Sequence, residues 1–166
     1  MTLPNLPDLT AEQIREACRR AGMEAEHTAL LEPDMSASGY AARLWSAGQE
    51  EAAIRFSAQA LPKEDAIRWG YELVRGGLKP DTPVSPLDMG ALHAVYAWVV
   101  APGEQARCAA LDCVDDVDPQ TPSVWLAYAV AWSGGSMVRG DDTPVPPPEH
   151  LTGIAVAMAV LLSGSG

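Results

Sequence analysis

Basic side chains are scarce in this sequence. Its 166 residues include 11 Lys or Arg against 22 Asp or Glu, and the lysines are Lys63 and Lys79 alone. Proteins that bind nucleic acid or an anionic membrane use clustered Lys and Arg, but the longest basic run here is Arg19-Arg20. We therefore expect no nucleic acid and no membrane among the partners. The net charge of -11 either serves solubility alone or attracts a basic protein.

Cysteines and targeting segments are also sparse. Cys18, Cys108 and Cys113 form an odd set without a CxxC pair, which is typical of buried thiols in a reducing compartment. The first residues have no positively charged region followed by an apolar core, so we expect no signal peptide. The longest apolar stretch, residues 151–162, is shorter than the roughly 20 residues of a membrane helix. These features predict a cytoplasmic protein.

Motifs of catalysis and metal binding are missing as well. His27, His93 and His150 each lack a second His or Cys three or four residues away, as a helical metal site would need. His93 lies in an apolar stretch and is expected to be a hydrogen-bonded core residue. Residues 133–136 (Ser-Gly-Gly-Ser) lack the spacing of a nucleophile elbow and are more typical of a helix end and tight turn. We predict a non-enzymatic protein without metal or cofactor.

What the sequence does contain is a series of apolar helical patterns separated by Pro and Gly. Thr10 and Gln13 have the spacing of a capping box, and Ser85 and Thr121 are N-cap residues that each precede a proline. Pro62 is likewise predicted to occupy the first position of a helix, and residues 23–35 are predicted to be irregular. Helices are expected at about residues 11–21, 39–47, 49–60, 62–75, 86–100, 102–114, 122–133 and 150–162.

These patterns predict an all-α fold, in the form of a compact orthogonal bundle of about seven or eight helices. Residues 1–166 are predicted to form a single helical domain. Residues 1–50 could be a less regular N-terminal extension of it. The helix over residues 86–100 is apolar almost all round, which predicts a central place in the core. Prolines recurring between the helices leave open an alternative, a short solenoid of stacked helical hairpins.

The segment after residue 131 is the best candidate for a protein interface. Each of the five tryptophans is expected in the core by default, but Trp132 lies between a helix end and a proline-rich loop, where aromatic anchors of interfaces are common. Three successive prolines keep that loop extended. The predicted interface residues are Trp132, Ser133, Gly134, Gly135, Ser136, Asp141, Asp142, Pro146, Pro147 and Pro148.

Three stretches of the chain carry a resemblance to a known family. They are residues 60–69 (Ala-Leu-Pro-Lys-Glu-Asp-Ala-Ile-Arg-Trp), residues 131–136 (Ala-Trp-Ser-Gly-Gly-Ser), and the proline run at residues 146–148 followed by Leu-Thr-Gly at 151–153. With Trp98 and Pro102 between them, they resemble an uncharacterised bacterial family of helical proteins with a W-S-G-G-S plus Pro-rich motif. The resemblance covers about residues 52–163. Family members usually have two adjacent tryptophans near Trp69, and here Arg68 takes the first place.

The resemblance also implies a biological setting. Such proteins tend to be encoded in Gram-negative type VI secretion clusters, near PAAR-type spike tips and the adaptors that load effectors onto them. It therefore implies a co-chaperone-like accessory protein that binds a secretion adaptor, an effector or a spike-tip protein before export. It implies no catalytic residues.

Three functional hypotheses follow from the sequence. The preferred one is an accessory protein of a type VI secretion system that sequesters a partner through its acidic surface and the 132–148 loop. The second is an acidic immunity protein that neutralises a basic toxin by electrostatic complementarity. The third is an enzyme that binds an anion through the backbone amides of residues 133–136.

Overall fold

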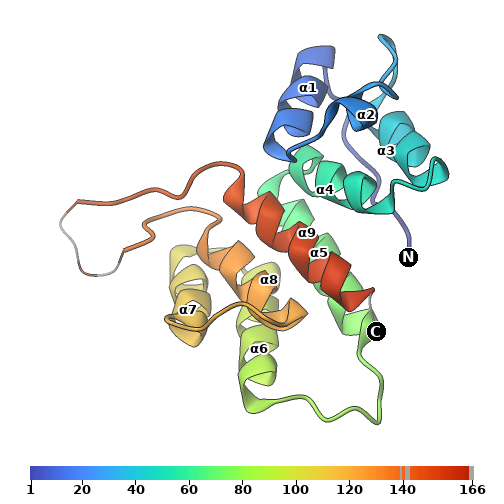
Figure 1. Cartoon of the computed structure of the whole chain (residues 1–166). Coiled ribbons are helices and arrows are strands. Elements are labelled where there is room, and N and C mark those ends of the chain that lie inside the picture. The colour runs from blue at the N-terminus through green and yellow to red at the C-terminus, as the bar shows by residue number, and fades with distance from the viewer. Residues whose placement is uncertain (139, 141–142, 165–166) are drawn as a thin grey trace.

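The computed structural model describes residues 1–138, 140 and 143–164, and within these ranges it is all-α, as predicted (Figure 1). Eight helices have ten or more residues, and the ninth, α2, has four. The helices are α1 (Ala11–Arg20), α2 (Ala25–Thr28), α3 (Ala37–Ser46), α4 (Glu50–Ala60), α5 (Lys63–Gly77), α6 (Pro86–Val100), α7 (Glu104–Val114), α8 (Pro122–Ala131) and α9 (Leu151–Ser163).

Helix starts are set by local hydrogen bonds, and the predicted caps are confirmed. The Thr10 hydroxyl accepts from the Gln13 amide, while the Gln13 side chain accepts from the Thr10 amide. The Ser85 and Thr121 hydroxyls cap α6 and α8 by accepting from the Asp88 and Val124 amides, each ahead of a proline in the first turn. These caps satisfy backbone N–H groups that have no partner inside their helix, which fixes where each helix begins.

The core consists of two apolar clusters that meet along α4. The smaller cluster packs α1, α3 and one side of α4 around Tyr40 and Phe56, whose rings meet edge to face at 4.8 Å. The larger cluster contains the opposite side of α4 and the inner faces of α5 to α9. Helix α4 therefore joins the N-terminal helices to the rest of the molecule.

Helix α9 runs across the middle of the larger cluster. It packs against α4, α5 and α8, two of which are far from it in sequence (Figure 1). Each repeat of a solenoid contacts only its neighbours, so this arrangement is that of a compact helix bundle. Small residues permit the close packing: Ala155, Ala157 and Ala159 are all buried in α9.

Some sequence-based expectations about helix positions were wrong. Residues 23–35 include the short helix α2, and α5 begins at Lys63 because the backbone of Pro62 is extended, with ψ 147°. Helix α6 is not central: it packs against α5, α7 and α8 on one side and exposes Met89 and Tyr96 on the other. His93 lies on that exposed side and is not a core residue.

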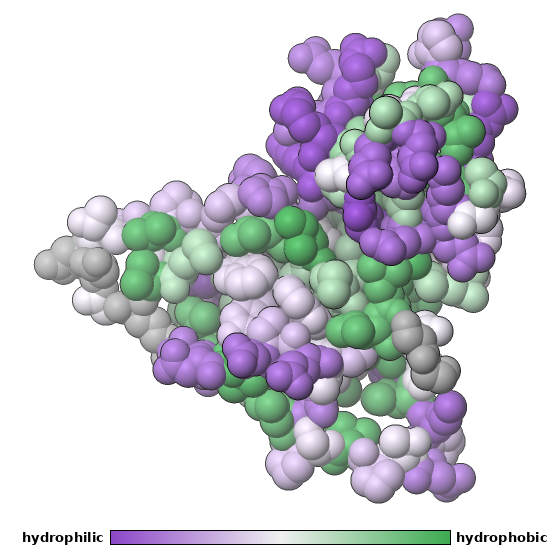
Figure 2. Space-filling view, viewed as in Figure 1, coloured by the Kyte–Doolittle hydropathy of each residue, from purple (hydrophilic) through white to green (hydrophobic). Residues whose placement is uncertain are grey.

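The surface differs between the two parts of the molecule. Figure 2 shows mostly hydrophilic side chains over α1 and α3, and hydrophobic side chains along α9 and the loop that follows α8. The exposed apolar residues of those two segments are Met137, Val138, Val145, Ile154 and Leu162. In the part of the chain that the structure describes, no helix is both long enough and apolar enough to cross a membrane.

Candidate functional site: a cleft between the motif segments

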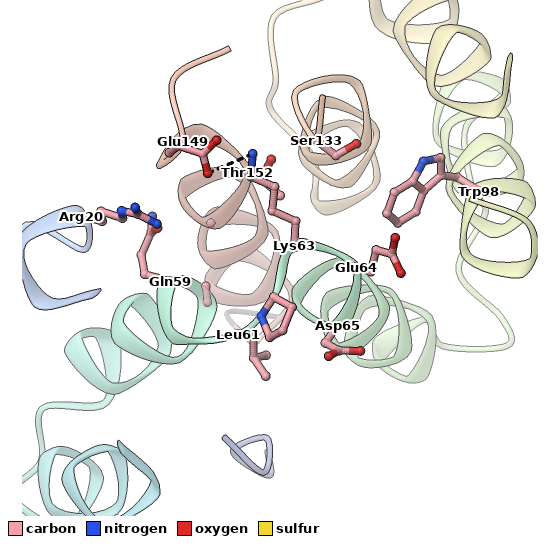
Figure 3. Close-up of a pocket in the computed structure, with 13 residues that line it drawn as sticks. Arg20, Gln59, Leu61, Lys63, Glu64, Asp65, Trp98, Ser133, Glu149 and Thr152 are labelled. Atoms are coloured by element: carbon pink, nitrogen blue, oxygen red, sulfur yellow. Dashed lines mark ion pairs between the residues drawn. The ribbon is translucent and has the colours of Figure 1, made fainter. Parts of the chain in front are cut away.

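Segments from distant parts of the sequence meet at one open cleft of about 570 Å³, called here the main cleft (Figure 3). The end of α4 and the start of α5 line it, together with Ser133 just beyond α8, the start of α9 and Trp98 of α6. Arg20 of α1 completes the lining. The three stretches that carry the family resemblance thus each contribute side chains to the same cleft.

The wall between α4 and α9 depends on a close helix approach. The Gln59 side-chain amide donates a hydrogen bond of 2.9 Å to the carbonyl of His150, just before α9. A Cβ atom at position 153 would lie 2.6 Å from the Gln59 side chain, closer than real contacts allow. Gly153 therefore leaves room for the Gln59 side chain in its hydrogen-bonded position between α4 and α9.

The basic side chains of the main cleft are already paired. Lys63 Nζ lies 3.3 Å from Glu149 Oε2, which links the start of α5 to the segment before α9. Arg20 Nε lies 2.8 Å from a Glu16 carboxylate oxygen in the preceding turn of α1. Partly exposed pairs of this kind contribute at most about 1 kcal/mol each to stability. Glu149 offsets the charge of Lys63, whereas Glu16 is shared between Arg20 and Arg19.

Among the carboxylates that line the main cleft, Glu149 pairs with Lys63 and Asp65 pairs with Arg68, which leaves Glu64. It is exposed in the first turn of α5, and it has no ion pair among the described residues. Its carboxylate points toward the indole ring of Trp98 in Figure 3, and both residues line the main cleft. This end of the cleft therefore combines a negative charge with an aromatic side chain.

A second cleft of about 410 Å³ adjoins the first. The two clefts share Leu61, Pro62 and Asp65, so the Leu-Pro step between α4 and α5 forms a ridge common to both. Residues 4–7 of the N-terminal segment form one wall of the second cleft, and Trp69 and Glu72 of α5 form the other. The two clefts, one on each side of the Pro62 ridge, are together called the groove here.

The Ser-Gly-Gly-Ser turn is built around a buried arginine that sequence reasoning missed. Arg107 of α7 is only 5% exposed, and its guanidinium donates to the carbonyls of Ala131 at 2.7 Å and Ser136 at 3.4 Å. The same group makes two hydrogen bonds, of 2.6 and 2.7 Å, to the Glu104 carboxylate. These bonds hold the pKa of Glu104 below its usual range. Arg107 thus fixes the chain direction after α8.

Gly135 is required at that turn for two reasons. Its φ is +63°, a backbone conformation that other residues rarely adopt, and a Cβ there would lie 2.6 Å from the Arg107 guanidinium. We expect Gly135→Ala to lower the free energy of unfolding by about 1–2 kcal/mol, as measured by urea denaturation. Gly134→Ala is the matched control, since Gly134 has no positive φ and open space around the added carbon. Equal effects at the two positions would show that Arg107 does not constrain the turn.

The loop that follows is closed at its base. The Ser136 hydroxyl accepts from the Val138 and Val145 amides, at 3.2 and 3.1 Å, and the Met137 amide donates to the Val145 carbonyl at 2.8 Å. The predicted interface residues Asp141 and Asp142 lie outside the described residues. Of the proline run, Pro146 and Pro148 are exposed, whereas Pro147 is buried. Pro147 therefore contributes to packing and not to the surface.

The predicted anchor Trp132 is half-buried. It caps the end of α8 and packs at the edge of the larger cluster, with its ring 4.9 Å from that of Tyr128. The Tyr128 hydroxyl lies 2.7 Å from the carbonyl oxygens of both Val114 and Val117 and donates its one proton between them, which joins α8 to the end of α7. Trp132 does not line either cleft, whereas its neighbour Ser133 lines the main one. The structure thus separates the predicted interface residues into cleft, turn and loop.

The remaining candidate ligands are dispersed. In the described ranges, no group of three or more His, Cys, Asp or Glu side chains lies close enough together to hold a metal ion. His27 accepts a hydrogen bond from the Glu24 amide through Nδ1, which is a local helix cap. Cys18 is buried and Cys108 and Cys113 are half-buried, and all three are free thiols.

Comparison with known families gives one match. The model of a family of unknown function, DUF6931, matches residues 40–166. The chain belongs to this family. The DUF6931 match contains every lining residue of the main cleft except Arg20, whereas residues 4–7 at the second cleft lie outside it. No curated protein matches the chain, and no solved structure does.

Proposed function

We propose that this chain is a non-enzymatic accessory protein of a type VI secretion system, which binds an adaptor, chaperone or effector before that protein is loaded. The main cleft would be the binding site. One observation carries the proposal: residues 60–69 come together with the two later stretches of the family resemblance around one open cleft.

The shape and chemistry of the site support a protein ligand. The main cleft is open at the surface and is lined by a mixture of charged, hydroxyl and apolar side chains. It adjoins a second cleft across Pro62, which gives it the extended form that suits a length of polypeptide. Apolar side chains on the nearby loop and on α9 would add contact area around it.

Filling the main cleft tests the proposal. Ser133→Trp places an indole ring into the cleft from a half-buried position just beyond α8. We expect this variant to lose at least about tenfold of its partner binding with unchanged helical circular dichroism, because about 1.4 kcal/mol of lost contact gives that factor. The measurement is affinity capture from the native host, with the captured secretion adaptor or effector quantified by mass spectrometry.

Two further variants make the result specific. Ser46→Trp adds the same ring at the exposed end of α3 and is expected to capture as much partner as the unmodified chain. Gly134→Trp places the ring next to Ser133 but outside the cleft, in open space. If Gly134→Trp captures less partner while Ser133→Trp captures as much as the unmodified chain, the partner binds the loop surface. That result would contradict the cleft as the binding site.

The immunity-protein alternative remains a second candidate because the chain carries a net charge of -11. Long-range attraction between an acidic inhibitor and a basic toxin weakens strongly when salt is added. Protection of cells from a toxin encoded beside this gene, with salt-sensitive complex formation, would favour this alternative over the secretion role.

A further inference from the structure

We infer that the two adjoining clefts bind an extended segment of the partner protein that carries basic side chains, with one Lys or Arg held between Glu64 and Trp98. This inference rests on the proposed function, because it names the chemistry of the segment that the cleft would receive. It goes beyond that function by assigning the charge, the conformation and the anchor position of the partner.

The charges in the groove favour a cationic segment. The cations of the main cleft, Lys63 and Arg20, are paired with Glu149 and Glu16. Glu64 keeps no ion pair among the described residues, and Glu72 of the second cleft is likewise without one there. In the second cleft Arg68 pairs with Asp65. Each cleft therefore keeps one carboxylate without an ion pair among the described residues. A guest with two basic groups would neutralise both.

Trp98 makes the Glu64 end selective for a cation. Trp98 is 5% exposed, so its ring is held by the core, yet it lines the main cleft where the Glu64 carboxylate points. A Lys or Arg side chain can interact with an indole ring and a carboxylate at the same time, the first through its stem and charge and the second through a charge-assisted hydrogen bond. A purely apolar side chain could contact the ring but not bind the carboxylate, and an acidic side chain would be repelled by it.

The ridge at Pro62 favours an extended backbone. Because Leu61, Pro62 and Asp65 border both clefts, a guest that reaches both carboxylates must cross this ridge along the surface. Ala66, whose amide donates to the Pro62 carbonyl at 2.9 Å, and Ile67 are buried in the core, so packing fixes the chain just after the ridge. A helix is about 10 Å wide with its side chains, whereas an extended chain follows a narrow surface groove more closely.

The test uses a fluorescein-labelled decapeptide of alternating Ala and Lys, titrated against the full chain at low ionic strength and followed by fluorescence anisotropy. We expect it to bind, and the corresponding Ala and Glu decapeptide to show no binding. Glu64→Gln should weaken binding of the Lys peptide about five- to tenfold, since it removes the charge-assisted hydrogen bond.

Glu50→Gln is the matched control. Glu50 is also an exposed glutamate in the first turn of a helix, but it lines neither cleft. It removes the same charge and the same helix-dipole interaction, so binding should change by less than about twofold. Equal losses in Glu64→Gln and Glu50→Gln would overturn the inference, because only the overall charge would then matter. Failure of the Lys peptide to bind the unmodified chain would also overturn it.

A second variant tests the aromatic part of the anchor. Trp98→Phe keeps a ring in the core but weakens cation binding, and we expect a loss of about two- to fivefold for the Lys peptide with unchanged circular dichroism. Unchanged affinity would remove Trp98 from the anchor and overturn that assignment. If the Lys peptide does not bind while Ser133→Trp still loses the native partner, the inference of a basic segment is wrong and the cleft remains the proposed site. If Ser133→Trp retains the native partner, the proposal of the cleft as the binding site is wrong.

Discussion

Replacing Arg107 with methionine is expected to lower the free energy of unfolding by about 3 kcal/mol, the largest effect of any single change considered. A buried guanidinium that is removed leaves its acceptors without a partner, and such losses amount to about 3–5 kcal/mol for buried ion pairs and less where one partner is exposed. Here the Ala131 carbonyl is buried with Arg107, whereas the Glu104 side chain is 65% exposed. Urea denaturation of the two proteins measures the difference.

The control for this change is Arg68→Met. Arg68 is exposed on α5 and contacts Asp65 at 3.5 Å, so its removal should change stability by no more than about 0.5 kcal/mol. The loss of stability in Arg107→Lys should lie between those of Arg107→Met and Arg68→Met. Lysine keeps the charge but lacks the planar guanidinium that reaches several oxygens at once. A loss below 1 kcal/mol for Arg107→Met would contradict the view that this arginine fixes the turn after α8.

Gly70→Ala is expected to destabilise the protein by about 2 kcal/mol, although the same change normally stabilises a helix. A Cβ at position 70 would lie 2.9 Å from Leu126 Cδ2 and 3.1 Å from Val156 Cγ1. Helices α8 and α9 are thus packed directly against the backbone of α5. The added methyl group has to move side chains in the middle of the core, and that strain exceeds the gain in helix propensity.

Gly76→Ala, in the same helix, is expected to change the free energy of unfolding in the opposite direction. No atom lies within 4 Å of a Cβ added at Gly76, so only the backbone effect acts there. We expect a stabilisation of about 0.5–1 kcal/mol. Thermal unfolding of both variants should therefore move the midpoint in opposite directions. A shift in the same direction for both would contradict the close packing of α5 against α8 and α9.

The sequence was sufficient to predict the features that depend on neighbouring residues. The capping box of Thr10 and the N-caps at Ser85 and Thr121 involve partners three residues away, and the all-α fold follows from the helical patterns between them. Trp132, the best candidate for an interface anchor because of its place at a helix end, is half-buried, and its role at an interface stays a prediction. Such features depend on residues that are close in sequence, so they can be predicted without knowing how the helices pack.

Features that depend on packing could not be predicted in this way. Arg107 contacts backbone atoms 24 and 29 residues further along the chain, and its sequence signal is only the Glu104 spacing, which is common on helix surfaces. Helix α6 was placed in the centre because its residues are apolar, yet a uniformly apolar helix carries no periodicity that shows which side is buried. His93 was misplaced for the same reason. The meeting of Glu64, Trp98 and Ser133 depends on how three helices, α5, α6 and α8, pack together.

The central claim is that the main cleft is where a partner protein binds. The most direct measurement is amide hydrogen exchange of the full chain, with and without the secretion partner captured from the native host. We predict slower exchange on binding at the amides of the residues that line the cleft from three sides, which are Leu61, Lys63, Glu64, Asp65, Ser133, Glu149, Thr152 and Gly153. Protection confined to the exposed side of α6, or to the loop beyond residue 136, would contradict it.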